Sequence, residues 1–130
     1  MKVLFYSSDE KGGGLKVQDL VTAKIPRECL EIYRSIRELS NRLRYRSQDV
    51  AAAVLVATGT EDLKSLVSIR NLLENIRNIL ILPNSDQRNI SLGHSLYPRF
   101  IGFADGSLDD IAAVINNVFG NAFNRGMGSI

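Results

Sequence analysis

An unbroken apolar run lies between Asp49 and Thr60, in the sequence DVAAAVLVATGT. Its hydrophobic residues do not alternate with polar ones, so both faces of this segment are expected to be covered by other parts of the protein. A run of this kind, closed by a Thr-Gly-Thr turn, is typical of a central strand in a parallel sheet. Three further segments have the same pattern and are predicted to be strands: Lys2–Ser8 (KVLFYSS), Asn78–Leu82 (NILIL) and Arg99–Ala104 (RFIGFA).

The segment Lys16–Ala23 (KVQDLVTA) has polar residues between its apolar ones, which predicts a strand at the edge of the sheet. It is connected to the strand Lys2–Ser8 by the polar, glycine-rich loop Ser7–Gly14. A parallel crossover usually needs a dozen or more residues, most often including a helix. This second strand is therefore expected to run antiparallel to the first, with an unusually short parallel crossover as the alternative.

Hydrophobic residues recur at helical spacing in the remaining segments. Pro26–Arg46 is predicted to be the longest helix, because proline suits the first helical position and one face of the segment is apolar. Thr60 is a natural N-cap for a second helix, and Ser107 for the last one. Gln87–Tyr97 has a weaker helical pattern that contains a glycine.

Strands that alternate with helices in this way predict an α/β three-layer sandwich with a mostly parallel sheet. Right-handed crossovers then give a flavodoxin-like, doubly wound fold with five strands in the order 2-1-3-4-5. We expect one domain over residues 1–120, followed by a glycine-rich and frayed tail at residues 121–130.

Composition excludes some classes of protein. The 130 residues carry a net charge of only +2, whereas a folded nucleic-acid-binding protein usually shows a concentrated basic patch. Cys29 is the only cysteine, so an intrachain disulfide is not possible and a reducing compartment fits. No apolar run reaches the roughly 20 residues of a membrane span, and the start does not have the pattern of a signal peptide. A soluble cytoplasmic protein that binds neither nucleic acid nor membrane is expected.

Polar side chains follow several of the predicted strands. In doubly wound sheets, ligands bind beyond the carboxyl ends of the strands. The candidate residues for binding a ligand or a partner at this rim are Ser8, Asp9, Thr58, Asn84 and Asp105. The alternative is that these residues form turns and cap helices, which Ser, Thr, Asn and Asp often do where a strand meets a helix.

Motifs of common enzyme classes are not found. Three glycines follow Lys11. A P-loop would continue with a lysine and then a serine or threonine, and this pattern is not present after the glycines. His94 is the only histidine, and no G-x-S-x-G elbow is present to supply an activated serine. Cys29 and His94 alone cannot form a four-ligand zinc site. We therefore predict no catalytic residue, no metal site and no cofactor.

With the strands placed, the chain resembles a response-regulator receiver domain over nearly its whole length. The stretch LVTAKIPRECLEIYRSI resembles the second strand and helix of a receiver, and VLVATGTEDL its central strand and following loop. ILILPNSD resembles the fourth strand, and FIGFADGSLDDIAAVI the fifth strand and last helix. The glycine loop stands where a receiver has its first helix.

The resemblance implies where functional residues would lie. A receiver has an acidic pair after the first strand that holds magnesium, and a phosphate-accepting Asp that ends the central strand. It also has a Ser or Thr at the end of the fourth strand and a Lys at the end of the fifth. The matching positions in this chain are, in the same order, Ser7 and Ser8, Ala57 or Thr58, Pro83, and Ala104. Asp9 and Glu10 follow the first strand one or two places late, and Asp9 is the alternative acceptor.

The resemblance thus implies a non-enzymatic signalling or regulatory module that lacks the phosphorylation site of receivers and acts through protein–protein contacts. It further implies a homodimer through the last strand and the last helix, as in many receivers. The alternative function is that of a sensor which binds a small ligand or nucleotide at the rim. A small hydrolase or transferase is the third and least favoured hypothesis.

Overall fold

The computed structural model describes residues 2–8, 12–45 and 49–117. Within them, five strands form one sheet in the order β2-β1-β3-β4-β5. The strands are β1 (Lys2–Ser7), β2 (Leu30–Tyr33), β3 (Val50–Val56), β4 (Arg77–Leu82) and β5 (Phe100–Phe103). All four neighbouring pairs are parallel. The flavodoxin-like fold and the strand order are therefore confirmed, whereas the prediction that the second strand is antiparallel is wrong.

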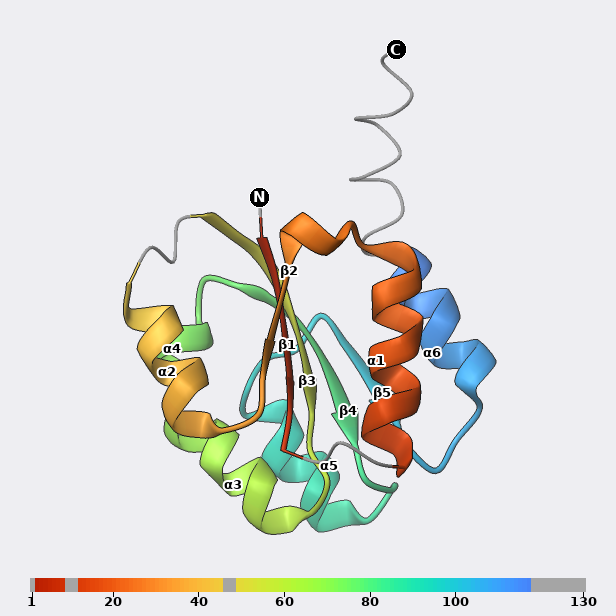
Figure 1. The fold of residues 1–130 in the computed structure, drawn as a ribbon. Coiled ribbons are helices and arrows are strands. Elements are labelled where there is room, and N and C mark those ends of the chain that lie inside the picture. Colours follow the sequence, from red (N-terminus) through yellow and green to blue (C-terminus); the bar gives the residue numbers. More distant parts are fainter. Residues whose placement is uncertain (1, 9–11, 46–48, 118–130) are drawn as a thin grey trace.

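Helices cover both faces of this sheet and complete the three layers (Figure 1). One face carries α1 (Gly12–Lys24) and α6 (Leu108–Ile115), and the other carries α2 (Ile36–Arg44), α3 (Thr60–Ser68), α4 (Arg70–Leu73) and α5 (Gln87–His94). A separate apolar cluster fills the space on each side. Because strand side chains alternate between the two faces, Leu4 and Tyr6 belong to one cluster and Val3 and Phe5 to the other.

Strand β3 occupies the centre of the sheet, as its apolar sequence predicts. It lies between β1 and β4, both parallel to it. Every side chain from Ala52 to Ala57 is at most 3% exposed. Burial on both faces removes the usual need for alternating polar positions, and this is why the segment contains none.

The segment Lys16–Ala23, predicted as an edge strand, lies instead within helix α1. Val17 and Val21 are fully buried and four residues apart, the spacing of one helix face. The helix begins within the glycine run, so the first helix of the receiver pattern is present rather than replaced by a loop. This helix provides the crossover that a parallel β1–β2 pair requires.

The predicted long helix Pro26–Arg46 is also wrong, because the segment divides into three elements. These are a short 3-10 helix η1 (Arg27–Cys29), strand β2 and helix α2. Ser35 sets the start of α2: its side-chain oxygen accepts a 3.1 Å hydrogen bond from the backbone N–H of Glu38. This is an N-cap, and an N-cap residue does not itself have helical backbone angles. The residues before it are therefore free to extend and pair with β1.

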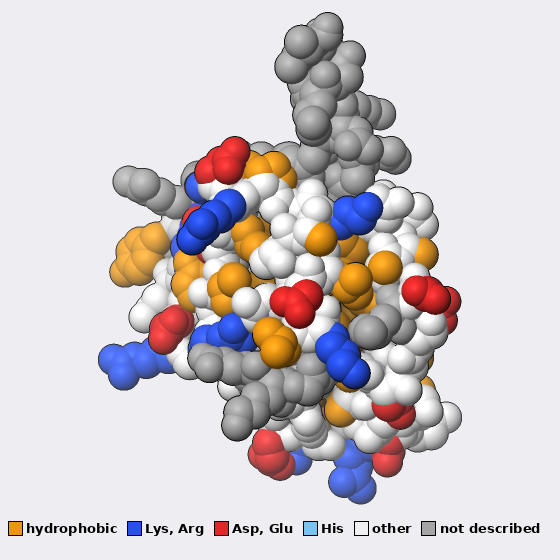
Figure 2. All heavy atoms as spheres, turned by 45° about the vertical axis from the view of Figure 1, so that its right-hand side comes forward, with side chains coloured by type: hydrophobic (Ala, Val, Ile, Leu, Met, Phe, Trp, Pro, Cys, Tyr) orange, Lys and Arg blue, Asp and Glu red, His pale blue; other side chains and the backbone are white. Residues whose placement is uncertain are grey.

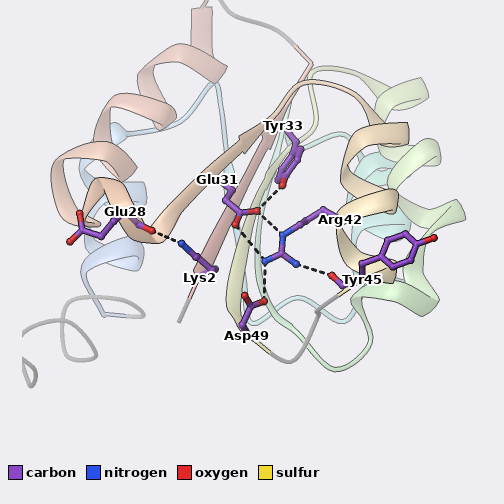
Figure 3. Close-up of polar contacts among 7 residues, drawn as sticks. All are labelled: Lys2, Glu28, Glu31, Tyr33, Arg42, Tyr45 and Asp49. Carbon is purple, nitrogen blue, oxygen red and sulfur yellow. Dashed lines mark hydrogen bonds and ion pairs between the residues drawn. The ribbon is translucent and has the colours of Figure 1, made fainter.

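Arg42, on α2, forms ion pairs with Glu31 on β2 and with Asp49 just before β3 (Figure 3). Its Nε atom lies 2.7 Å from Glu31 Oε1 on β2, and its Nη2 atom lies 2.9 Å from Asp49 Oδ1, just before β3. Its Nη1 atom donates to the carbonyl oxygen of Tyr45, and Tyr33 donates a 2.6 Å hydrogen bond to Glu31. Burial by itself would raise the pKa of Glu31, but the hydrogen bonds from Arg42 and Tyr33 outweigh it and the pKa is lowered. These contacts join β2, α2 and the approach to β3.

The other predicted helices are present, although the one after Gly59 is divided into α3 and α4 and one cap differs. Ser107 caps α6, as predicted, by accepting a hydrogen bond from the N–H of Asp109. The N-cap of α3 is Gly59, and Thr60 is the first helical residue instead of the cap. The glycine in α5 has a packing role, since a Cβ atom at Gly93 would lie 3.0 Å from a methyl carbon of Leu80. Glycine at this position lets α5 approach β4 closely.

None of the helices in the described segments is long and apolar enough to cross a membrane. The tail expected at residues 121–130 lies outside the described residues.

Candidate functional site

Two of the candidate rim residues meet where β1 and β3 end. Ser8 is the first residue after β1, and Thr58 is the second residue after β3. Since β1 and β3 are neighbours, with Ser7 opposite Val56, the parallel arrangement brings their carboxyl ends together. The two hydroxyl oxygens, Ser8 Oγ and Thr58 Oγ1, are 3.3 Å apart.

Asp62, in the first turn of α3, reaches across both strand ends. Its Oδ2 atom accepts hydrogen bonds from Ser8 Oγ at 3.3 Å, from the backbone N–H of Thr58 at 3.1 Å and from Thr58 Oγ1 at 3.5 Å. Its Oδ1 atom accepts a 2.6 Å hydrogen bond from the phenolic hydroxyl of Tyr6, a β1 residue that is 1% exposed. We call Tyr6, Ser8, Thr58 and Asp62 the Asp62 cluster.

The electrostatics of this cluster favour a neutral tyrosine. Burial, and then the hydrogen bond and negative charge of Asp62, raise the pKa of Tyr6 well above its ordinary value. The phenol therefore keeps its proton and remains a hydrogen-bond donor at neutral pH. Asp62 consequently has a permanent donor on one oxygen and up to three donors on the other.

Asn84 lies in a second cluster, at the start of α5. Its Oδ1 atom accepts hydrogen bonds from the N–H of Asp86 at 2.9 Å and from Asn89 Nδ2 at 3.1 Å. The side-chain oxygen of Asn89, which is 4% exposed, accepts from Thr60 Oγ1 at 2.9 Å. Asp86 caps α5 by accepting from the N–H of Arg88. The Asn84 cluster thus joins the first turns of α3 and α5, and its members act as turn formers and caps.

The remaining rim candidates do not join either cluster. Asp105 is exposed, and its side chain makes no hydrogen bond or ion pair with the described part of the chain. Asp9 lies outside the described residues, as does Glu10. A cation that the sequence did not single out is nearby: Arg34 donates from Nη1 to the carbonyl oxygen of Ser7 at 3.3 Å and from Nη2 to Gln18 Oε1 at 2.6 Å.

Three polar residues of the rim were not predicted from the sequence: Tyr6, Asp62 and Asn89. Tyr6 stands inside an apolar strand and is read as core, and Asp62 is read as a first-turn acid that complements the helix dipole. A tyrosine near the end of a buried strand needs a partner for its hydroxyl, and this requirement is the one signal that pointed to a nearby acceptor.

The positions that match the functional residues of receivers lie at the carboxyl ends of the strands. Ser7 and Ala57 are fully buried, and Pro83 and Ala104 are partly exposed. The backbone N–H groups of Ala57 and Ala104 continue the sheet by donating to Ile81 and to Leu82. The described residues contain no group of three or more His, Cys, Asp and Glu side chains that could hold a metal ion.

No family model matches the chain, and no curated protein matches it. Solved structures are similar to it in fold. A CheY-like response regulator receiver domain protein from Methanospirillum hungatei JF-1 has a TM-score of 0.66 at 11% identity, over 95% of this chain and 97% of that chain. The phosphorylated cyanobacterial phytochrome response regulator RcpA has a TM-score of 0.63 at 13% identity, over 90% of each chain. A protein from Burkholderia pseudomallei K96243 described as pilus assembly-related has a TM-score of 0.57 at 14% identity, over 87% of this chain and 90% of that chain.

These likenesses extend over almost the entire chain and agree with the observed strand order and parallel pairing. The chain therefore has the fold of a response-regulator receiver domain.

Proposed function

We propose that this chain is a non-enzymatic regulatory module, a receiver-like domain that acts through protein–protein contacts and not through phosphorylation. The observation that carries this proposal is the position of Asp62. It lies over the ends of β1 and β3, and its two oxygens accept hydrogen bonds from Tyr6, Ser8 and Thr58. The carboxylate at these strand ends is thus engaged in holding the rim together.

Chemistry on an aspartyl phosphate needs a carboxylate that is free to attack and positive charge on the transferred phosphoryl group. The short bond from Tyr6 engages Oδ1 of Asp62, and the bonds from Ser8 and Thr58 engage Oδ2, so both oxygens that could attack or bind a metal ion already accept hydrogen bonds. Arg34, the cation beside Ser7, is bonded to a backbone carbonyl and to Gln18. These contacts support a structural role for the rim.

The test is the intact mass of the protein after incubation with acetyl phosphate and Mg²⁺, beside a receiver domain that has the complete acidic site. We expect the mass to stay unchanged while the control gains one phosphoryl group. A gain in this chain would contradict the proposal, and its loss in Asp9→Asn or in Asp62→Asn would identify the acceptor.

A protein is the favoured class of partner. The net charge is +2, and on the side of the molecule in Figure 2 positive and negative side chains are interspersed, without a broad patch of one sign. Nucleic-acid binding usually needs such a patch. The same reasoning makes a cytoplasmic module without nucleic-acid or membrane binding our proposal, with the single cysteine consistent with a reducing compartment.

Self-association through β5 and α6 is part of the proposal. β5 is an edge strand, Phe100 at its start is 37% exposed, and a hollow of about 220 Å³ lies between β5 and α6. Light scattering over a range of concentrations tests this contact. We expect a dimer that Phe100→Glu dissociates, and a monomer at high concentration would contradict the contact without affecting the proposal about Asp62.

A further inference from the structure

The hollow of about 220 Å³ between β5 and α6 has mainly apolar walls. Gly102 of β5 lines it and pairs with Ile81 of β4, so a side chain at Gly102 would point to the same face of the sheet as that of Ile81. A Cβ atom at Gly102 would lie 3.0 Å from Ile81 Cδ1 and 3.4 Å from Ile111 Cγ1. The outer strand therefore contributes no side chain to this part of the hollow. Four aliphatic side chains line it, which are those of Ile79, Ile81, Ile111 and Val114.

The lining is polar only near the start of α6, where Ser107 and Asp110 contribute to it. The hydroxyl of Ser107 is engaged as the N-cap of α6. Asp110 is the one charged residue in the lining, and its exposed side chain forms no hydrogen bond or ion pair with the described part of the chain. A group that suits this hollow therefore combines an apolar side chain with a positive charge placed toward the start of α6.

The sequence that follows α6 has this combination. Residues 118–130 (VFGNAFNRGMGSI) contain Arg125 as their only charged side chain, two positions after Phe123. Side chains two positions apart point to the same side of an extended chain. If the segment runs antiparallel to α6, it passes Val114 first and Asp110 later, so Phe123 meets the aliphatic walls and Arg125 meets the acid.

The segment is long enough to reach the hollow. Phe123 is six residues beyond Asn117, the last described residue, and six extended residues span up to about 20 Å. Ile111, in the wall of the hollow, is six residues before Asn117, which is about 9 Å along a helix. Gly120 lies between Asn117 and Phe123, and glycine readily adopts the backbone angles of a turn.

The hollow also has room for a phenyl ring. A cavity of about 150 Å³ that is lined by Leu, Ile and Phe stays dry and binds benzene, and the hollow of about 220 Å³ has walls of the same kind. A segment of the same chain has an advantage over a separate molecule, because the covalent connection keeps its effective concentration high.

We propose that residues 118–130 dock along α6, with the phenyl ring of Phe123 in the hollow and the guanidinium group of Arg125 beside Asp110. The chain then covers an apolar surface that would otherwise be open to other proteins. This inference goes beyond the proposed function and does not depend on it. Phe100 is not part of the lining, so a docked segment leaves it exposed for the contact between copies.

The experiment is a methyl NMR spectrum of the full chain with labelled isoleucine and valine. A phenyl ring in the hollow shifts the methyl resonances of Ile81, Ile111 and Val114, and Phe123→Leu should remove these shifts. Met127→Leu, a change of similar volume in the same segment, is the matched control and should leave the three residues unchanged. If Phe123→Leu also leaves them unchanged, the segment frays as its glycines predict, and the proposal is overturned.

A charge exchange tests the pairing of Arg125 with Asp110. The quantity compared is the change in methyl resonances that Phe123→Leu produces in each background. This change should be lost in Arg125→Asp, because two acids then repel each other, and it should return when Asp110→Arg is added. Asp110 is exposed, so neither substitution should lower Tm appreciably. A loss that the exchange does not restore would overturn the pairing.

Dilution identifies the chain to which the ring belongs. Docking within one chain does not depend on protein concentration, so we expect the same methyl resonances throughout the range used for light scattering. Shifts that disappear on dilution would assign the ring to a second copy and overturn docking within one chain. The acetyl phosphate test has no bearing on this result, so the two proposals fail separately.

Discussion

The phenolic hydroxyl of Tyr6 donates a 2.6 Å hydrogen bond to the carboxylate of Asp62, a residue 56 positions further along the chain. The bond joins the end of β1 to the first turn of α3, the helix that follows the central strand β3 along the chain. One contact thus fixes the position of a carboxylate over the strand ends and satisfies the hydroxyl of a buried tyrosine. Its energetic contribution can be measured separately from the weaker bonds around it.

We expect Tyr6→Phe and Asp62→Ala each to destabilise the domain, and their effects to be strongly non-additive. Hydrogen bonds to charged groups contribute about 1.5–3 kcal/mol, so a coupling energy of about 1–2 kcal/mol is predicted from a double-mutant cycle in urea. Ser8→Ala, which removes an exposed 3.3 Å bond to the same carboxylate, should cost under about 0.5 kcal/mol. A Tyr6–Asp62 coupling near zero would show that the short bond does not stabilise the fold.

Asn78→Leu is expected to stabilise the domain. The side-chain oxygen of Asn78 is buried and has no hydrogen-bond partner among the described residues, and the residue is only 2% exposed. Leucine has a similar branched shape and removes the unsatisfied acceptor, so the free energy of unfolding should rise by about 1 kcal/mol. Asn75→Leu, at an exposed position, is the control and should stay within about 0.5 kcal/mol of the parent. Destabilisation by Asn78→Leu in urea unfolding would show that the oxygen has a partner in solution.

Gly93→Ala tests the close approach of α5 to β4. The new Cβ atom would lie 3.0 Å from Leu80 Cδ2 and 3.3 Å from Leu82 Cδ2, and both leucines are fully buried and have little room to move. Overpacking typically costs about 1–3 kcal/mol, and alanine recovers about 1 kcal/mol of helix propensity, so a net loss of about 1 kcal/mol is expected. Gly59→Ala, where nothing lies within 4 Å of the added carbon, has no packing cost, and it should lose only the preference of an N-cap for glycine over alanine, under about 1 kcal/mol. A stabilised Gly93→Ala protein would contradict the packing argument.

The pairing of Glu31 with Arg42 predicts a specific pH dependence. The pKa of Glu31 is lower in the folded protein than its ordinary value of 4.5, so the ion pair stabilises the fold above that value. This contribution should be lost as the pH falls through 4.5 and then through the lowered folded-state pKa. The difference in unfolding free energy between the parent and Glu31→Gln should therefore be largest near pH 7 and shrink in acid. A difference that remains constant from pH 7 to pH 3 would rule out this linkage.

The sequence predicted the sheet well where burial alone determines the pattern. The apolar runs at β1, β3 and β4 have few residues that could be read in another way, and the order of the strands follows from the general rules for alternating strands and helices. Thr58 and Ser8 were correctly placed at one rim, because the ends of neighbouring parallel strands must converge.

The larger errors lie between β1 and α2, where local pattern and tertiary structure conflict. Glycines at the start of α1 oppose helix formation, and the buried spacing of Val17 and Val21 decides the outcome only once the sheet is present. The residues of β2 have the apolar spacing of a helix, and pairing with β1 makes them a strand. The sequence also contained an overlooked signal, since Ser35 and Glu38 have the spacing of a capping box.

The lengths of the strands bear on how the protein behaves at high concentration. The two outer strands, β2 and β5, have four residues each, whereas the inner strands have six or seven. A short outer strand offers few unpaired backbone groups with which a strand of another molecule could pair, and this is one way in which natural sheets avoid aggregation. Association between copies at β5 would therefore depend on side chains, not on an extended backbone ladder, and should be reversible on dilution without a lag phase or growth of fibres.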